Sequence, residues 1–121
     1  MDAGSLENIV KIYNLAKVKP QIDESILVKI ALQMLCGLAY LHSNNQLHRD
    51  VKSANVLINT KGEIKLTDFG IAKQIDEDKE FTKTSVGTRS YMSPERIKGE
   101  EYGPKSDIWG FGLIMYELAT G

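Results

Sequence analysis

The side chains that could do chemistry gather in two short segments of the 121-residue chain. The first segment holds a carboxylate at Asp50, an ammonium group at Lys52 and an amide at Asn55. The second is Asp68-Phe69-Gly70, which begins with a further carboxylate. A base, a cation and two oxygen ligands in this order suit the in-line transfer of a phosphoryl group held by Mg²⁺. These residues indicate a class of reaction, whereas composition indicates only a globular chain.

Helices are expected before the first segment and after the second one. Ser5 is a typical helix N-cap and precedes apolar residues at helical spacing. Asp23 is expected to cap a second, longer helix, which ends near Asn44. Ser93 should begin a short helix, and Ser106 should cap a final helix that is apolar on nearly every side. Because a helix that is apolar all round must be buried, we expect this final helix at the centre of the fold.

A β-hairpin is expected between the two chemical segments. Residues 56–58 and 63–66 form two short runs typical of strands, joined by the turn sequence Asn59-Thr60-Lys61-Gly62. The stretch 75–83 is acidic and poor in apolar residues, which predicts a surface loop. The fold class that follows is α+β, mainly α with a short β-hairpin, in one domain.

Composition argues against several classes of protein. The formal net charge of −1 disfavours a general binder of nucleic acid or of an anionic membrane. No signal peptide is visible at the N-terminus, and the longest apolar run, residues 108–116, is too short to span a bilayer. The single cysteine, Cys36, indicates a reducing compartment and is expected to be a buried structural thiol. We therefore expect a cytoplasmic location, with a nuclear one as the alternative, and no nucleic-acid or membrane partner.

Four motifs in series resemble those of the eukaryotic protein kinases. They are Asp50-x-Lys52-x-x-Asn55, Asp68-Phe69-Gly70, Gly87-Thr88-x-x-Tyr91-Met92-x-Pro94-Glu95 and Asp107-x-Trp109-x-x-Gly112. The stretches 1–6 and 87–96 look most like MAP kinase kinases, within the sterile-type serine/threonine kinases, although Ser53-Ala54 stands where Pro-Ser is more usual in that subfamily. The resemblance implies a partial kinase domain over residues 1–121, within the large C-terminal lobe. It would run from the end of the hinge through the buried helix after the activation segment, without the small lobe and the last C-terminal helices.

The resemblance gives four side chains a chemical role. Asp50 would accept a hydrogen bond from the substrate hydroxyl and take its proton. Lys52 would lie against the transferring phosphoryl group and neutralise its charge. Asn55 and Asp68 would supply oxygen ligands to Mg²⁺, which bridges the phosphates of ATP.

The resemblance also implies contacts with the nucleotide. Leu57 would form the apolar floor beneath adenine, and Asp2 and Ser5 would lie at the ribose edge. With the three polar residues that face the phosphates, the implied ATP-binding set is Asp2, Ser5, Lys52, Asn55, Leu57 and Asp68.

Further residues would have structural roles. His48 would stack with Phe69, which Gly70 follows, in the structural spine of a kinase. Glu95 would pair with an arginine from a later helix, and Asp107 would tie the catalytic-loop backbone to the buried helix. Asp107 could instead be an ordinary first-turn aspartate favoured by the helix dipole. His42 is interpreted as a surface histidine at a helix end.

A regulatory role is implied for the arginine before the catalytic aspartate. In kinases of this type, Arg49 would hold a phosphorylated loop residue, since a phosphate pairs well with a guanidinium group. Thr84 is the first candidate for phosphorylation by an upstream activating kinase, followed by Ser85 and Thr82. A plain polar loop is the alternative for each of them.

Two hypotheses about function follow. In the first, the chain is part of an ATP- and Mg²⁺-dependent protein kinase, serine/threonine or dual-specificity, whose protein substrate could be a MAP kinase. The chain alone would be inactive, because no glycine-rich loop and no lysine–glutamate pair for the phosphates precede its catalytic loop. In the second, the chain is a non-catalytic binding module that docks a partner protein.

Overall fold

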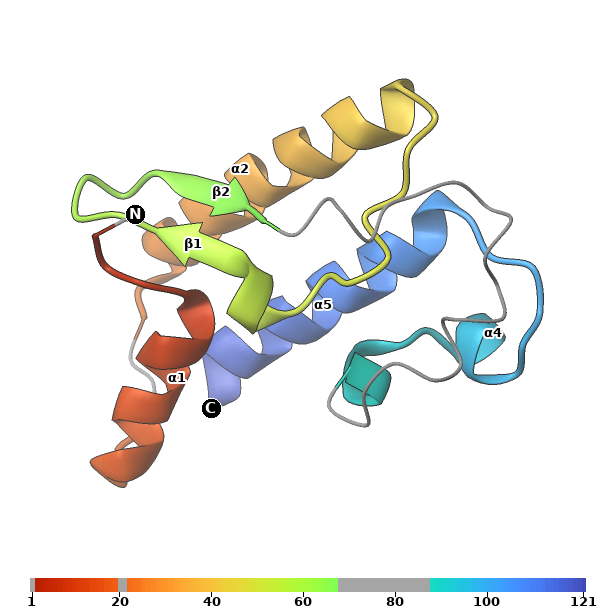
Figure 1. Ribbon diagram of the computed structural model, residues 1–121. Helices are drawn as coiled ribbons and strands as arrows, with labels where there is room; N and C mark the ends of the chain where they lie inside the picture. The colour runs from red at the N-terminus through yellow and green to blue at the C-terminus, as the bar shows by residue number, and fades with distance from the viewer. Residues whose placement is uncertain (1, 20–21, 68–87) are drawn as a thin grey trace.

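Helices dominate the part of the chain that the structure describes, and a β-hairpin lies against them (Figure 1). The computed structural model describes residues 2–19, 22–67 and 88–121. In chain order the elements are α1 (Leu6–Leu15), α2 (Glu24–Ser43), the 3₁₀ turn η1 (Ser53–Asn55), β1 (Val56–Ile58), β2 (Ile64–Leu66), the 3₁₀ turn η4 (Thr88–Tyr91), α4 (Pro94–Ile97) and α5 (Pro104–Thr120). The predicted fold class, mainly α with a short β-hairpin, is confirmed.

Helix α1 begins at the predicted N-cap. The hydroxyl of Ser5 accepts from the Asn8 amide nitrogen at 3.3 Å, and Asn8 Oδ1 accepts from the Ser5 backbone nitrogen at 2.9 Å. This reciprocal pair is a capping box, which satisfies two N–H groups that the first turn would otherwise leave open. The buried side chains of Leu6 and Val10 then fix α1 against the rest of the core.

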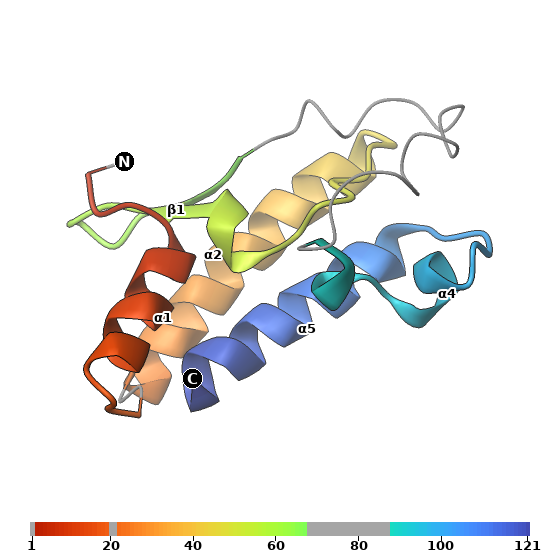
Figure 2. The same cartoon turned by 60° about the horizontal axis from the view of Figure 1, so that its bottom comes forward.

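Helix α2 runs antiparallel to α5, and the two pack side by side in both views (Figures 1 and 2). It begins after Asp23 and ends at Asn44, as predicted, although the Asp23 side chain makes no capping hydrogen bond. Its buried face also packs against β2 and consists of Ile30, Met34, Leu38 and Leu41. With a mean hydropathy of 1.5, α2 is long and apolar enough to cross a membrane, but a core helix passes the same test, so this is weak evidence of a span.

Cys36 lies on the outer face of α2 and is exposed, so the predicted buried thiol is wrong. The prediction failed because apolar residues occur on several faces of α2, whereas neighbouring elements cover only one of them. Val28 and Leu32 are exposed on the same helix, at 58% and 62%.

The predicted hairpin is present, with its second strand beginning at Ile64. Three antiparallel pairs set the register: Val56↔Leu66, Leu57↔Lys65 and Ile58↔Ile64. The side chain of Gln33, on α2, accepts from the Ile64 N–H at 2.9 Å and donates to the Gly62 carbonyl at 3.0 Å. These two bonds, together with buried Val56, attach the hairpin to the helical core.

Helix α5 differs from the prediction at its start and in its burial. Its N-cap is Gly103, while Ser106 lies inside the first turn, where its hydroxyl is 2.8 Å from the Ser93 hydroxyl. Ile114 and Leu118 are fully buried, but Trp109 and Tyr116 are 45% and 69% exposed. The prediction of burial on every side is therefore wrong for this structure, in which α2, η4 and the loop before η1 cover only part of the helix.

The loop before η1 lies directly on α5 at Gly110. A Cβ atom built on Gly110 would lie 2.7 Å from the backbone oxygen of Val51 and 3.0 Å from the Val51 Cβ. Such distances are below van der Waals contact, so only glycine allows this approach. Gly112, two residues further along the same helix, has open space around the position of a Cβ atom.

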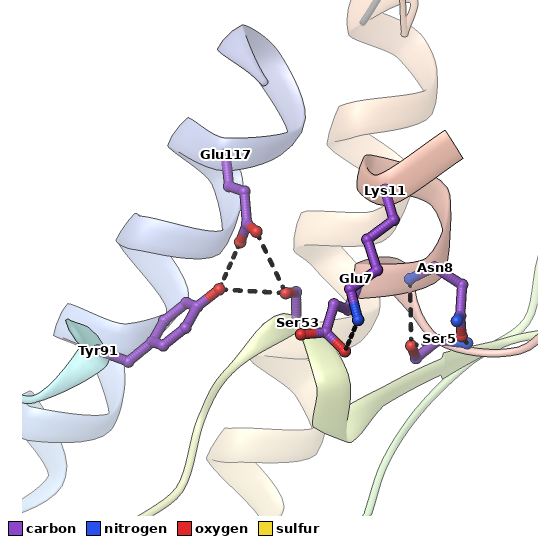
Figure 3. A network of polar contacts seen from close by, with 7 residues as sticks. All are labelled: Ser5, Glu7, Asn8, Lys11, Ser53, Tyr91 and Glu117. Carbon is purple, nitrogen blue, oxygen red and sulfur yellow. Dashed lines mark hydrogen bonds and ion pairs between the residues drawn. The ribbon is translucent and has the colours of Figure 1, made fainter. Parts of the chain in front are cut away.

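A triangle of polar contacts attaches the far end of this loop to α5 (Figure 3). Tyr91 donates its hydroxyl hydrogen to Glu117 Oε2 at 2.7 Å, and the Ser53 hydroxyl lies 3.1 Å from the Tyr91 oxygen. Ser53 also donates to Glu117 Oε1 at 3.4 Å. Burial and the hydrogen bond to Glu117 raise the pKa of Tyr91 to about 12. The triangle therefore favours the protonated phenol.

We expect Gly110→Ala to lower the free energy of unfolding by about 1–3 kcal/mol, because the added methyl group overpacks the contact with Val51. Gly112→Ala is the matched control. It should stabilise the chain by roughly 0.5–1 kcal/mol, since alanine is the better helix former and meets no neighbour. Denaturant unfolding measures both. Equal effects of the two substitutions would contradict the close contact.

We also expect Tyr91→Phe to remove a pH-dependent part of the stability. Because folding raises the pKa of Tyr91 from 10.0 to about 12, the neutral phenol stabilises the fold fully below pH 10.0, and this contribution disappears as the pH rises to about 12. The difference in unfolding free energy between wild type and Tyr91→Phe should shrink across that window. The exposed Tyr116 provides the control variant Tyr116→Phe. A difference for Tyr91→Phe that stays constant with pH would count against the triangle.

Candidate active site

The carboxylate of Asp107 holds the backbone at the start of the candidate catalytic loop, residues 48–55. Asp107 Oδ1 accepts from the Arg49 N–H at 3.0 Å, and Oδ2 accepts from the His48 N–H at 2.9 Å. Asp107 is only 3% exposed and lies in the first turn of α5. A buried carboxylate needs such donors, and in return it fixes the direction in which the loop leaves α2.

His42 is a member of this site that sequence reasoning missed. Its Nε2 lies 2.8 Å from Asp107 Oδ2, and its side chain is 16% exposed, so it is not a surface histidine. The sequence predicted its place in the last turn of α2, where a histidine can interact favourably with the helix dipole. Its partner is 65 residues away in the chain and could not be inferred from local pattern.

The side chain of His48 holds the backbone N–H of Asp50. Its Nδ1 accepts from the Asp50 N–H at 3.1 Å, and its Nε2 is 2.6 Å from the Thr67 carbonyl oxygen. Since a carbonyl only accepts, Nε2 carries the hydrogen and Nδ1 is the acceptor. The imidazole is fully buried in this neutral form, which suits a structural role.

One carboxylate oxygen of Asp50 has polar partners, and the other has none among the described residues. Oδ2 accepts from Asn55 Nδ2 at 3.1 Å and lies 3.7 Å from Lys52 Nζ. Oδ1 is buried and has no hydrogen-bond partner among the residues that the structure describes. A buried acceptor without a partner is costly, so a hydrogen bond donated by the hydroxyl group of a bound molecule would stabilise Oδ1.

Asn55 is oriented so that its amide oxygen can face a cation. Its Nδ2 donates to both the carbonyl and the carboxylate of Asp50, at 2.9 and 3.1 Å, which leaves Oδ1 as the free end of the amide. An amide oxygen is a ligand that Mg²⁺ accepts. Asp68, the other predicted ligand, lies outside the described residues. Within residues 2–19, 22–67 and 88–121, no cluster of three or more His, Cys, Asp or Glu side chains could hold a metal ion.

Three of the predicted nucleotide contacts, Asp2, Ser5 and Leu57, lie at the hairpin. Ser5 pairs with Leu57 in an isolated antiparallel bridge, but the Ser5 side chain is engaged in the α1 cap. The Asp2 carboxylate accepts from the Thr60 N–H at 2.9 Å and from its hydroxyl at 3.0 Å. The backbone bond from Thr60 lowers the pKa of Asp2 below its ordinary value. In this structure Asp2 thus holds the hairpin turn, and its contact with ribose stays a prediction.

Arg49 is buried against a second arginine and a tyrosine. Its backbone has a φ of 71°, in the left-handed region, and its side chain is 5% exposed. The guanidinium carbon of Arg49 is 5.9 Å from the centroid of the Tyr102 ring, and that of Arg96 is 4.9 Å from it. Burial lowers the pKa of Arg96 from its ordinary value. Positive charge is therefore concentrated beside the loop, where Arg49 was predicted to hold a phosphate.

The remaining predicted residues can be placed only in part. Glu95 is the second residue of α4 and is half-buried, and its carboxylate has no hydrogen bond or ion pair within the described part of the chain. The other predicted residues lie outside the described residues: Phe69, Gly70, Thr82, Thr84 and Ser85. Their roles stay predictions.

Comparison with known proteins agrees with the motifs. The chain matches the protein kinase domain family over residues 1–121. It is 48% identical over 122 residues to the dual specificity mitogen-activated protein kinase kinase dSOR1 of Drosophila melanogaster, covering all of this chain and 29% of the relative. It is also 48% identical over 122 residues to mitogen-activated protein kinase kinase 2 of Arabidopsis thaliana, covering all of this chain and 32% of the relative.

The chain thus spans about a third of the length of these curated relatives. The resemblance to protein kinases, and to MAP kinase kinases among them, is confirmed over its whole length. The carboxylate of Asp50, the amide of Asn55 and the ammonium group of Lys52 lie together in the structure, and the chain belongs to the protein kinase family.

Proposed function

We propose that this chain forms the catalytic-loop and magnesium-binding part of an ATP-dependent protein kinase of the MAP kinase kinase type. The reaction would transfer the γ-phosphoryl group of ATP to a protein hydroxyl. The observation that carries the proposal is the buried Oδ1 of Asp50, which lacks a hydrogen-bond partner within the described residues while Lys52 and Asn55 lie beside the other carboxylate oxygen. Most buried oxygens in proteins have a donor, so an unpartnered one beside a lysine and an asparagine favours a role in binding a hydroxyl group.

Asp50 acts as the acceptor for the substrate hydroxyl. The hydroxyl donates to Oδ1, while the Asn55 amide, which donates to both the carbonyl and the carboxylate of Asp50, keeps that carboxylate from turning away. As the phosphoryl group transfers, the proton passes to Asp50. General-base assistance of this kind contributes roughly 10²–10⁴-fold in rate.

Lys52 and Asn55 serve the phosphates. The Lys52 ammonium group lies on the same side as Asp50 Oδ2, where it can neutralise charge on the transferring group. Asn55 Oδ1, together with Asp68, would hold Mg²⁺. When bound, the ion neutralises the phosphate oxygens and aligns them for in-line transfer.

The substrate class follows from the relatives. Both proteins described above are named as mitogen-activated protein kinase kinases, and one is named as dual-specificity. We extend this to the present protein: its substrate would be a MAP kinase, phosphorylated on serine or threonine or with dual specificity, and an upstream kinase would activate it.

A non-catalytic binding module is the second candidate. The exposed apolar side chains of Ile12, Leu15 and Tyr116, at 65%, 85% and 69%, favour association with a partner. A pure docking module, however, does not require an aspartate with an unpartnered carboxylate oxygen beside a lysine and an asparagine. The kinase proposal accounts for both sets of residues, because these apolar faces can also pack within a larger domain.

We expect Asp50→Asn, in the complete product of the gene, to lower kcat for phosphorylation of a catalytically inactive MAP kinase by roughly 10²–10⁴-fold. An amide cannot take the proton, although it fills the same space. Transfer of labelled γ-phosphate from ATP in the presence of Mg²⁺ measures the rate. The 121-residue chain alone should transfer almost no phosphate.

Asp23→Asn is the matched control, because Asp23 is an exposed aspartate whose side chain makes no capping bond. It should leave kcat unchanged. Full activity of Asp50→Asn, or equal losses in both variants, would remove the proposal and favour the binding module.

A further inference from the structure

The peptide group between Arg49 and Asp50 is held at both ends by side chains. Its N–H donates to His48 Nδ1 at 3.1 Å. Its carbonyl oxygen accepts from Arg96 Nη1 at 2.5 Å. Because this peptide group leads directly into Asp50, its orientation sets where the catalytic carboxylate points.

Arg49 needs such support because its backbone is in a disfavoured region. With a φ of 71°, its Cβ crowds the neighbouring carbonyl, and residues other than glycine rarely take this conformation. Asp107 holds the N–H of Arg49, and Arg96 holds its carbonyl oxygen. Loss of either contact would let the backbone relax and turn Asp50.

Arg96 belongs to α4, which lies near the start of α5 (Figures 1 and 2). From there its side chain reaches the Arg49 carbonyl oxygen. Its guanidinium carbon is 4.9 Å from the centroid of the Tyr102 ring, a distance at which an aromatic face attracts a cation. A hydrogen bond from a charged donor is about twice as strong as one between neutral groups. The tyrosine thus keeps the arginine in the geometry that the carbonyl requires.

We propose that Arg96 is a positioning residue for phosphoryl transfer, and that Tyr102 keeps it in place. Arg96 touches neither substrate nor ATP in this role. It fixes the peptide group before Asp50, so that the carboxylate meets the substrate hydroxyl. This inference rests on the proposed kinase function.

The test uses the complete product of the gene with Mg²⁺, ATP and a catalytically inactive MAP kinase. Arg96→Met keeps the length of the side chain but removes the donor, and should lower kcat about tenfold, which is about 1.4 kcal/mol. The KM for ATP should stay within about twofold, because a lost transition-state contact lowers kcat alone. Arg96→Lys restores a donor and should recover most of the loss.

Lys98→Met is the matched control. Lys98 is an exposed cation just after α4, and this substitution removes the same charge as Arg96→Met. It should keep the kcat of the wild type. If Arg96→Met has the kcat of Lys98→Met, the inference is wrong. It is also wrong if Arg96→Lys loses as much kcat as Arg96→Met, because a donor at this position would then have no effect.

Tyr102 provides a second test should Arg96→Met fail to fold. Tyr102→Leu removes the aromatic face and should lower kcat, whereas Tyr102→Phe keeps the face and should retain it. Equal kcat in these two variants overturns the inference. A wild type without phosphoryl transfer overturns the proposed function as well, while an active wild type with an unaffected Arg96→Met overturns only the role of Arg96.

Discussion

The candidate catalytic loop depends on the hydrogen bonds that the buried carboxylate of Asp107 accepts. This carboxylate joins three parts of the chain: the first turn of α5, the end of α2 through His42, and the loop backbone at His48 and Arg49. Leaving a buried polar group without one of its hydrogen-bond partners typically costs about 1–3 kcal/mol, and more when the group is charged. A side chain with so many partners cannot move without moving the loop.

Helix α5 holds the loop at a second and a third point. Gly110 lets the backbone of Val51 approach, and Glu117 receives the hydroxyls of Tyr91 and Ser53. Asp107 and Glu117 are about 15 Å apart along the helix axis, at 1.5 Å per residue. Between these two carboxylates the loop lies on the helix, and Asp50, Lys52 and Asn55 take their positions from it.

Local signals predicted local structure well. The N-cap at Ser5 and the hairpin turn that ends at Gly62 depend on residues close together in the sequence, and both are present. The start of α5 was wrong because Pro104 can occupy the first turn, which places Ser106 inside the helix, where it pairs with Ser93. Burial was wrong for Cys36 and Trp109, because exposure depends on which neighbours cover a face.

The site residues likewise include some that the sequence predicted and some that it did not. Motif spacing was enough to select Asp50, Lys52 and Asn55, which the structure brings together. It did not select His42 or Arg96, whose contacts join residues far apart in the chain. Motif spacing also did not predict that Asp50 Oδ1 is buried without a hydrogen-bond partner in the described chain, because this depends on how distant residues pack around it.

The measurement that tests this account most directly is amide hydrogen exchange in Asp107→Asn, compared with wild type. An asparagine leaves one acceptor oxygen for the two N–H groups of His48 and Arg49, so at least one of these amides should exchange faster. The hairpin amides of Leu57 and Lys65, which pair between strands, should keep their protection. If His48 and Arg49 stay as protected as in wild type, Asp107 does not hold the loop, and the account is contradicted.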